Sequence, residues 1–440
     1  MSGTLPFLLV PLVFAFVLRE KSLQHCRAAC AVALSVRQIA IIANLYFTKL
    51  PGNAGDAARF YDSALGGFNW SKLVGTGADF YANFLATVFS VFGPSKEIAF
   101  QTSFVAFGLL LIAIGRFLRM FGYSEKAYVA ILLVGLSPSA VCYTSSILRE
   151  GWQELFLLLT CYFTVKLRQH FTPHTLLFFL GSLVLLGCLQ KGLALFAIIY
   201  GVLAFFYLTG RGQARAPMLL LAVAVIFMAV YFKVLGGVEF ELETSSNVVE
   251  AFTEGEIVEF ALDYRGSLNE ARANYADHLE LETVSGLMWA FPQLIIYYWA
   301  CPLPWQVGES IDFISMAEIW VRTALLVYGF LGIQKAGKEE RAALSFLWMM
   351  FAVLEIMFAA GTGNWGTAAR HRTVALPLLC VLSVSGLVKK RGTFGVEEEG
   401  PASEEAPLKL SRREQIRRRR RRSRGEHLIE ESASPGKRSP

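Results

Sequence analysis

Two short segments hold most of the residues of this chain that could do chemistry. The first, at 363–372, reads GNWGTAARHR and places Arg370, His371 and Arg372 beside a long apolar run. Charge at the edge of a membrane is costly unless a partner compensates it. The natural partner of two permanent cations is an anion such as a lipid phosphate. One arginine is enough for this, because a guanidinium can bind phosphate through two parallel hydrogen bonds.

The residues before these cations favour the same chemistry. Asn364 and Gly366 permit a tight turn, and the helix that follows would point the positive end of its dipole at an anion. Successive helical residues differ by about 100° in direction, so Arg370, His371 and Arg372 cannot all line one site. The alternative is that the cations only snorkel to the membrane interface. Positive charge is otherwise rare on this side of the predicted topology, which favours phosphate binding.

The second segment, at 55–62, reads GDAARFYD. Asp56 could act as a general base or as a metal ligand. Tyr61 could pack against a sugar ring or an isoprenoid chain. The alternative is that Asp56 is the N-cap of a helix that begins with two alanines, and both roles are compatible.

A third segment, SSILRE at 145–150, ends a predicted span. Arg149 could contact the same phosphate through a charge-assisted hydrogen bond. Alternatively, Arg149 and Glu150 form an internal ion pair that fixes the turn. Pro138 and Ser139 predict a kink in the preceding helix, as is common beside cavities in membrane proteins.

The elements that position these segments are predicted to be membrane helices. The chain has 440 residues, of which 54% are hydrophobic and 17% charged, and its mean hydropathy is +0.46. A soluble domain is nearer 25% charged. We therefore predict an all-α polytopic membrane protein with about eleven spans of roughly 20 residues. The predicted spans are 4–18, 28–48, 98–118, 127–147, 152–168, 174–190, 192–208, 217–235, 313–333, 343–361 and 373–388.

The lysines and arginines of short loops predict the orientation, because these residues stay on the cytoplasmic side. With eleven spans, six groups of cations fall on one face, so the N-terminus is expected outside and the C-terminus in the cytoplasm. The six groups are Arg19, Lys21 and Arg27; Arg116, Arg119 and Lys126; Lys166 and Arg168; Arg211 and Arg215; Lys335, Lys338 and Arg341; and Lys389, Lys390 and Arg391.

This topology gives a first prediction. Reporter fusions are expected to place residues 75 and 260 outside and residue 425 inside, because an odd number of spans separates each outer loop from the C-terminus. The measurement uses two fusions: a reporter that is active only on the outer face, fused at residue 75, and one that is active only on the inner face, fused at residue 425. Finding both residues on the same side would overturn the span count.

The outer face then receives two long loops, at 49–97 and 236–312, within a transmembrane domain at 1–391. Residues 291–305 in the second loop are apolar, rich in aromatic side chains and bounded by Pro302 and Pro304. Because proline breaks helices and aromatic side chains suit the headgroup layer, we predict a re-entrant or interfacial segment here.

The tail at 392–440 and the cysteines give no indication of nucleic-acid binding, of a disulfide framework or of a metal cluster. The tail has little to bury and is predicted to be disordered. Its arginine run at 417–422 would meet anionic headgroups on the cytoplasmic side, so no nucleic-acid partner is expected. The seven cysteines lie mostly in apolar runs, where they predict neither a disulfide framework nor a metal cluster.

These motifs resemble the GT-C superfamily, membrane glycosyltransferases that use polyprenyl-phosphate-linked sugars. Proteins of that superfamily place an aspartate in the first long extracytoplasmic loop, in a context similar to DAARFY at 56–61. Residues 145–150, 302–305 and 364–372 also resemble motifs of bacterial membrane proteins described as glycosyltransferase-like. The resemblance covers about residues 28–390. One difference is that Asp56 follows the second predicted span, whereas GT-C enzymes usually place it after the first.

The resemblance implies a transferase of the bacterial inner membrane that builds envelope polysaccharide from a polyprenyl-phosphate-linked sugar among membrane lipids. Asp56 would be catalytic, and Tyr61, Arg149, Asn364, Arg370, His371 and Arg372 would bind substrate. A divalent metal stays open as a cofactor, and no organic cofactor is expected. Two alternatives stay open: an O-antigen polymerase or ligase-like transferase that relies on Arg370 and His371, and a lipid-oligosaccharide transporter.

Overall fold

The computed structural model describes residues 5–50, 55–69, 77–209, 275, 284–387 and 394, and the regular elements within these ranges are all helices. These residues belong to one compact unit that extends to Val396. The predicted span at 217–235 and the tail from 397 onward lie outside the described residues.

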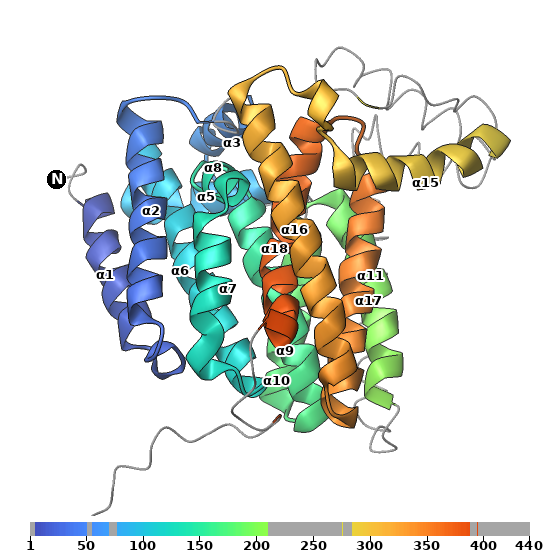
Figure 1. Cartoon of the computed structure of the whole chain (residues 1–440). Coiled ribbons are helices and arrows are strands. Elements are labelled where there is room, and N and C mark those ends of the chain that lie inside the picture. The colour runs from blue at the N-terminus through green and yellow to red at the C-terminus, as the bar shows by residue number, and fades with distance from the viewer. Residues whose placement is uncertain are drawn as a thin grey trace, which may run out of the picture. The chain divides into compact units, whose positions relative to one another are not determined.

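Helices cover the other predicted spans (Figure 1). Five of the described helices, α2, α6, α11, α16 and α17, are long and apolar enough to cross a membrane, or six if the bent pair α7–α8 is one span. This pattern indicates a membrane-embedded protein. The helices are α1 (Leu5–Arg19), α2 (Arg27–Tyr46), α6 (Lys96–Met120), α7 (Ala127–Leu136), α8 (Pro138–Thr144), α9 (Glu150–Gln169), α10 (Pro173–Leu189), α11 (Lys191–Thr209), α16 (Ser310–Lys335), α17 (Lys338–Ala360) and α18 (Trp365–Leu387).

A sharp break separates α7 from α8, as Pro138 predicts. The two helices differ in direction by 64°. Pro138 occupies the first turn of α8, where its missing N–H costs nothing, but it cannot continue the hydrogen bonding of α7. The break exposes polar backbone and two serine side chains, Ser137 and Ser139, within an otherwise apolar run.

The segment at 49–97, predicted as an outer loop, is helical over much of its length, and the helix expected to start near Asp56 is one of its elements. It contains α3 (Asp56–Leu65) and α5 (Ala78–Phe92). Two edge-to-face ring pairs hold these helices together, Phe60 against Tyr81 and Tyr61 against Phe89. The apolar face of α5 supplies the core on which α3 rests, and this fixes the position of Asp56.

The second outer loop contributes α15 (Val284–Ala300), which lies across the direction of α16 and α17 (Figure 1). The helix begins before the predicted segment at 291–305 and tolerates Pro292 inside it. It ends just before Pro302, in agreement with the prediction that the prolines stop a helix. Trp289 on this helix is 77% exposed. The crossing orientation and the exposed indole fit the expected re-entrant or interfacial segment.

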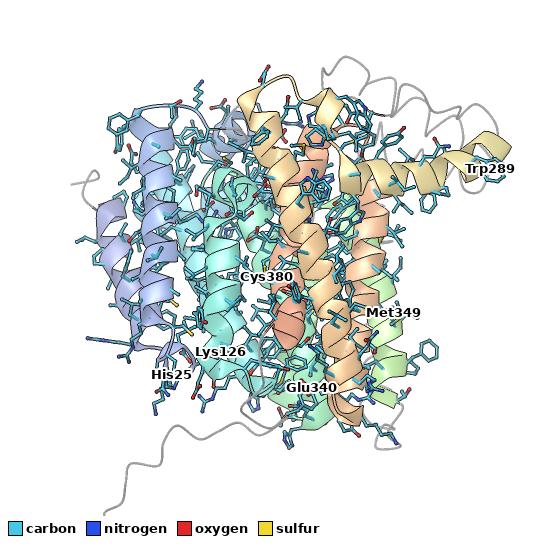
Figure 2. All side chains as sticks on the ribbon, viewed as in Figure 1. His25, Lys126, Trp289, Glu340, Met349 and Cys380 are labelled. Carbon is cyan, nitrogen blue, oxygen red and sulfur yellow. The ribbon has the colours of Figure 1, made fainter. Side chains whose placement is uncertain are left out.

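Helix ends that carry those predicted cytoplasmic cations that the structure describes gather at one end of the bundle. The cations at 211, 215 and 389–391 lie outside the described residues. Figure 1 shows the connections α1–α2, α6–α7 and α16–α17 at this end, and α3, α8 and the first turns of α18 at the other. Figure 2 shows Lys126 and Glu340 together at the cation-rich end. There the Tyr123 hydroxyl donates to Glu340 at 3.5 Å, which joins the α6–α7 connection to α17.

Close packing between α16 and α18 depends on small residues. A Cβ built on Gly386 would overlap the carbonyl oxygen of Tyr328, and one on Gly332 would overlap the side chain of Ser385. Helices in membranes gain stability from such close backbone approach, since lipid supplies little hydrophobic drive between them. This contact fixes the orientation of α18 and therefore of the residues at its start.

Gly386→Ala is expected to lower the free energy of unfolding by about 1–3 kcal/mol, because a rigid carbonyl must move to admit the methyl group. Gly181→Ala in α10 is the matched control: no heavy atom lies within 4 Å of its added Cβ, so helix propensity alone should stabilise it by up to about 1 kcal/mol. The measurement is the midpoint of unfolding by SDS in mixed micelles. Equal midpoints for the two variants would contradict the packing argument.

Candidate functional site

Asp56 and Arg370 lie side by side, although 314 residues separate them in sequence. Arg370 Nη1 donates to Asp56 Oδ2 at 2.5 Å, which joins the first turn of α3 to the first turns of α18. The Asp56 side chain is 48% exposed and that of Arg370 is 19% exposed. The pair therefore stands at the surface of one end of the bundle, within reach of a substrate.

A second carboxylate holds the same guanidinium. Arg370 Nε donates to Glu150 Oε1 at 2.5 Å, and the Glu150 side chain is only 2% exposed. The predicted ion pair between Arg149 and Glu150 is therefore replaced by a pair between Arg370 and Glu150. The reason is geometric: adjacent residues at a helix start do not face each other, whereas α18 presents Arg370 directly to α9.

Arg149 brings a second positive charge to the cluster. Its guanidinium lies 5.8 Å from the centre of the Phe60 ring, a cation–π contact with α3. Arg149 Nε is buried, with no hydrogen-bond partner among the described residues. The site thus combines two guanidiniums, from Arg149 and Arg370, with two carboxylates, from Asp56 and Glu150.

Burial raises the pKa of the Asp56 carboxyl, but the hydrogen bond and charge of Arg370, with a smaller contribution from Arg149, more than offset this, so the pKa is lowered overall. Asp56 is therefore ionised at neutral pH and able to accept a proton. The prediction of Asp56 as an N-cap needs a correction, because Gly55 is the N-cap and Asp56 is the first helical residue. Its carboxylate gains more from a guanidinium than from a backbone N–H.

His371 and Arg372 contact other neighbours than Arg370 does, as the helical fan predicts. The His371 ring stacks on Phe358 with centroids 4.6 Å apart, and its Nδ1 lies 3.0 Å from the Thr362 hydroxyl oxygen. Arg372 donates from Nε to the Ala368 carbonyl at 3.1 Å and from Nη2 to the Cys301 carbonyl at 3.3 Å. None of these contacts joins either residue to Asp56.

Tyr61 and Asn364, the other predicted binding residues, make contacts that shape the local structure. Asn364 Oδ1 accepts from the Thr367 N–H at 2.7 Å and so caps the start of α18. The Tyr61 ring packs on Phe89, and Lys96 Nζ lies 5.8 Å from its centre. The structure thus brings together Asp56, Arg149 and Arg370 but leaves the remaining predicted residues outside their cluster.

Sequence reasoning gave Glu150 a different partner and missed another buried charge pair altogether. This pair is Arg322 Nη2–Glu355 Oε2, 3.2 Å apart between α16 and α17. The signal was available, because an ionisable residue inside an apolar span marks a functional or paired site by default. Among the described residues, no three His, Cys, Asp or Glu side chains come together as a metal site would require.

No protein-family model matches the chain, and no curated protein is significantly similar to it. Function therefore has to be argued from the site itself, since a fold alone does not determine an activity.

Proposed function

We propose that the protein is an integral membrane glycosyltransferase that moves a sugar from a polyprenyl-phosphate-linked donor to an acceptor on the extracytoplasmic face. The observation that carries the proposal is the cluster of Asp56, Arg370 and Glu150 beside Arg149. It combines an ionised, half-exposed carboxylate with two guanidiniums at one end of a bundle of apolar helices. This is the pairing of base and phosphate clamp that glycosyl transfer from a lipid phosphate requires.

In the proposed reaction, an acceptor hydroxyl attacks the anomeric carbon of the donor sugar. The new bond forms between that carbon and the acceptor oxygen while the bond to the carrier phosphate oxygen breaks. Asp56 takes the proton of the hydroxyl. Negative charge develops on the departing phosphate, where Arg370 and Arg149 stabilise it. Arg370 Nη2 is suited to this role, because it is buried without a partner among the described residues.

The phosphate and Asp56 would compete for Arg370. When the carrier phosphate draws the guanidinium toward itself, Asp56 loses its strongest contact and becomes a better base. Glu150 keeps Arg370 in place during this exchange, because its buried carboxylate binds Nε rather than Nη1 or Nη2. In the metal-dependent variant of the proposal, Asp56 would instead help hold a divalent cation against the phosphate.

The topology that belongs to this proposal has eleven spans in a GT-C-like arrangement, the N-terminus outside and the C-terminus in the cytoplasm of a bacterial inner membrane. Its support is the separation of charges along the bundle. Among the described residues, the connections α1–α2, α6–α7 and α16–α17, which hold predicted cytoplasmic cations, lie at one end. Helix α3 and the first turns of α18, which carry Asp56 and Arg370, lie at the other (Figure 1). A polyprenyl carrier would then present its sugar to the site from the outer leaflet.

The alternatives make different use of the same residues. A polymerase or ligase-like transferase would rely on Arg370 and His371, but His371 is packed against Phe358 and its Nδ1 is engaged by the Thr362 hydroxyl. A transporter would use charges buried between helices, such as Arg322. It would move the lipid-linked sugar without breaking a bond, which an assay can detect.

The test is a reaction in proteoliposomes with synthetic polyprenyl-phosphate sugars as donors and an envelope-polysaccharide fraction as acceptor. We expect mass spectrometry to detect free polyprenyl phosphate, produced only when both donor and acceptor are present. Loss of activity with EDTA and its return with a divalent cation would assign Asp56 to metal binding. Transfer of intact donor across the bilayer without cleavage would reject the transferase in favour of the transporter.

A further inference from the structure

A groove of about 440 Å³ lies between α7 and α16 and is closed behind by α18. Its apolar walls come from Leu132, Leu133 and Leu136 of α7, Val321 and Leu325 of α16, and Leu376 of α18. Leu136 and Val321 are 46% and 50% exposed, so the groove opens on the face of the bundle that would meet hydrocarbon. A lipid chain is therefore the natural occupant of this part.

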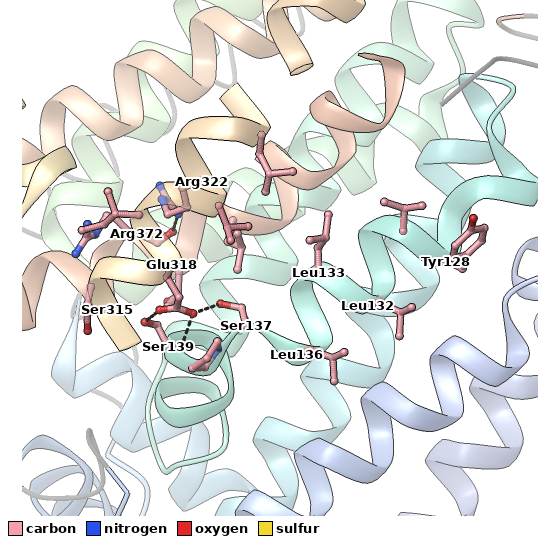
Figure 3. A pocket seen from close by; sticks show the side chains of 18 residues that line it. Tyr128, Leu132, Leu133, Leu136, Ser137, Ser139, Ser315, Glu318, Arg322 and Arg372 are labelled. Atoms are coloured by element: carbon pink, nitrogen blue, oxygen red, sulfur yellow. Dashed lines mark hydrogen bonds between the residues drawn. The ribbon is translucent and has the colours of Figure 1, made fainter. Parts of the chain in front are cut away.

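The groove is polar at one end and apolar at the other, as Figure 3 shows. Glu318 occupies the polar end beside the break between α7 and α8. Its Oε1 accepts from the Ser137 hydroxyl at 2.6 Å and the Ser139 N–H at 2.9 Å, and its Oε2 accepts from the Ser139 hydroxyl. A carboxylate can accept about four hydrogen bonds, so Glu318 keeps capacity for one more donor. Its negative charge meets hydroxyls and an amide but no cation among these contacts.

Arg372 also lines this end and carries the opposite charge. The residue is 4% exposed, two of its nitrogens donate to backbone carbonyls, and its Nη1 has no partner among the described residues. Arg322 separates the two charges: it is paired with Glu355, and its Nη1 donates to the Arg372 carbonyl at 2.7 Å. Because the Arg322–Glu355 pair is neutral, one negative and one positive group remain at the polar end, Glu318 and Arg372.

We infer that this groove binds one molecule of a zwitterionic aminophospholipid, with its phosphate at Arg372, its ammonium at Glu318 and an acyl chain along the leucines of α7. Glu318 is part-buried and Arg372 is buried, and the contacts above give neither of them an opposite charge. A charge held away from water without a counter-ion is costly, and such a headgroup supplies a counter-ion to both residues. Glu318 and Arg322 lie one helical turn apart, roughly 6 Å along the axis. Arg322 in turn donates to the Arg372 carbonyl, so Glu318 and Arg372 line the same end of the groove. An anionic phospholipid would supply a counter-ion to Arg372 but would leave Glu318 without a cation.

This lipid is distinct from any substrate bound at Asp56. Arg370 and Arg372 are two positions apart on α18 and therefore point about 200° apart around the helix. A headgroup at Arg372 cannot also contact the Asp56–Arg370 pair. The inference therefore does not rest on the proposed transferase activity, and its test measures lipid retention alone.

The test starts from protein reconstituted with equimolar phosphatidylethanolamine and phosphatidylglycerol of identical acyl chains. After exchange into detergent, native mass spectrometry counts the lipids retained by each chain. We expect phosphatidylethanolamine to be retained about tenfold or more over phosphatidylglycerol. Only phosphatidylethanolamine carries an ammonium that can donate a charge-assisted hydrogen bond to Glu318. Glu318→Gln should abolish the preference but keep retention. Arg372→Gln should lower retention of both lipids about tenfold or more.

A groove-filling variant keeps the inference testable if a charge variant fails to fold. Leu133→Trp places an indole within the groove and should abolish retention. Leu177→Trp, on an exposed position of α10, is the matched control and should retain lipid normally. Equal retention of the two lipids by the unmodified protein, or unchanged retention in Leu133→Trp, would overturn the inference.

Discussion

Asp56→Asn is expected to lower sugar transfer by roughly 10²–10⁴-fold, the contribution typical of a general base. The asparagine keeps the size of the side chain and can still accept a hydrogen bond from Arg370, but it cannot take the acceptor proton. Because Asp56 is half-exposed and Glu150 still holds Arg370, the fold should be retained. The measurement is turnover in the proteoliposome assay, beside an equilibrium measurement of polyprenyl-phosphate binding, which should persist.

Asp62→Asn is the matched control, since it removes an exposed carboxylate from the same helix without touching Arg370. It should leave turnover within a factor of about two. Normal turnover in Asp56→Asn, together with loss in Arg370→Ala and His371→Ala, would show that the aspartate is not the base. The polymerase-like mechanism would then replace it.

Arg370→Ala is expected to have two effects at once. It leaves Glu150 buried without its guanidinium, and removal of one partner from a buried ion pair costs about 3–5 kcal/mol of stability. It also removes a charge-assisted contact to the carrier phosphate, so polyprenyl-phosphate binding should weaken. The unfolding midpoint in SDS and the equilibrium binding of polyprenyl phosphate measure the two effects separately.

A double variant separates the structural role of Arg370 from its role in binding. Adding Glu150→Gln to Arg370→Ala removes the uncompensated buried charge, so most of the lost stability should return. Binding of the lipid phosphate should stay weak, because the clamp is still absent. If the double variant regained both stability and binding, Arg370 would be a structural residue only, and the phosphate-clamp proposal would fail.

The sequence by itself determined the features that depend on local chemistry. Length and apolarity of the runs predicted membrane-embedded helices, because a span must satisfy its backbone hydrogen bonds internally. Pro138 predicted the break between α7 and α8, and the helical period predicted that Arg370, His371 and Arg372 would point to different neighbours. Each of these follows from residues within a turn or two of one another.

Only the tertiary structure decided which charges meet. Arg370 binds carboxylates that lie 220 and 314 residues away, and no periodicity in the sequence relates these positions. The pairing arises because close glycine contacts orient α18 on α16, while the aromatic pairs with α5 position α3. The same packing pairs Arg372 with the backbone carbonyls of Ala368 and Cys301 at one end of the groove, and not with the site that the sequence assigned to it. In low-polarity surroundings each buried charge must find a partner. The sequence shows that these partners are needed, and the packing of the helices selects them.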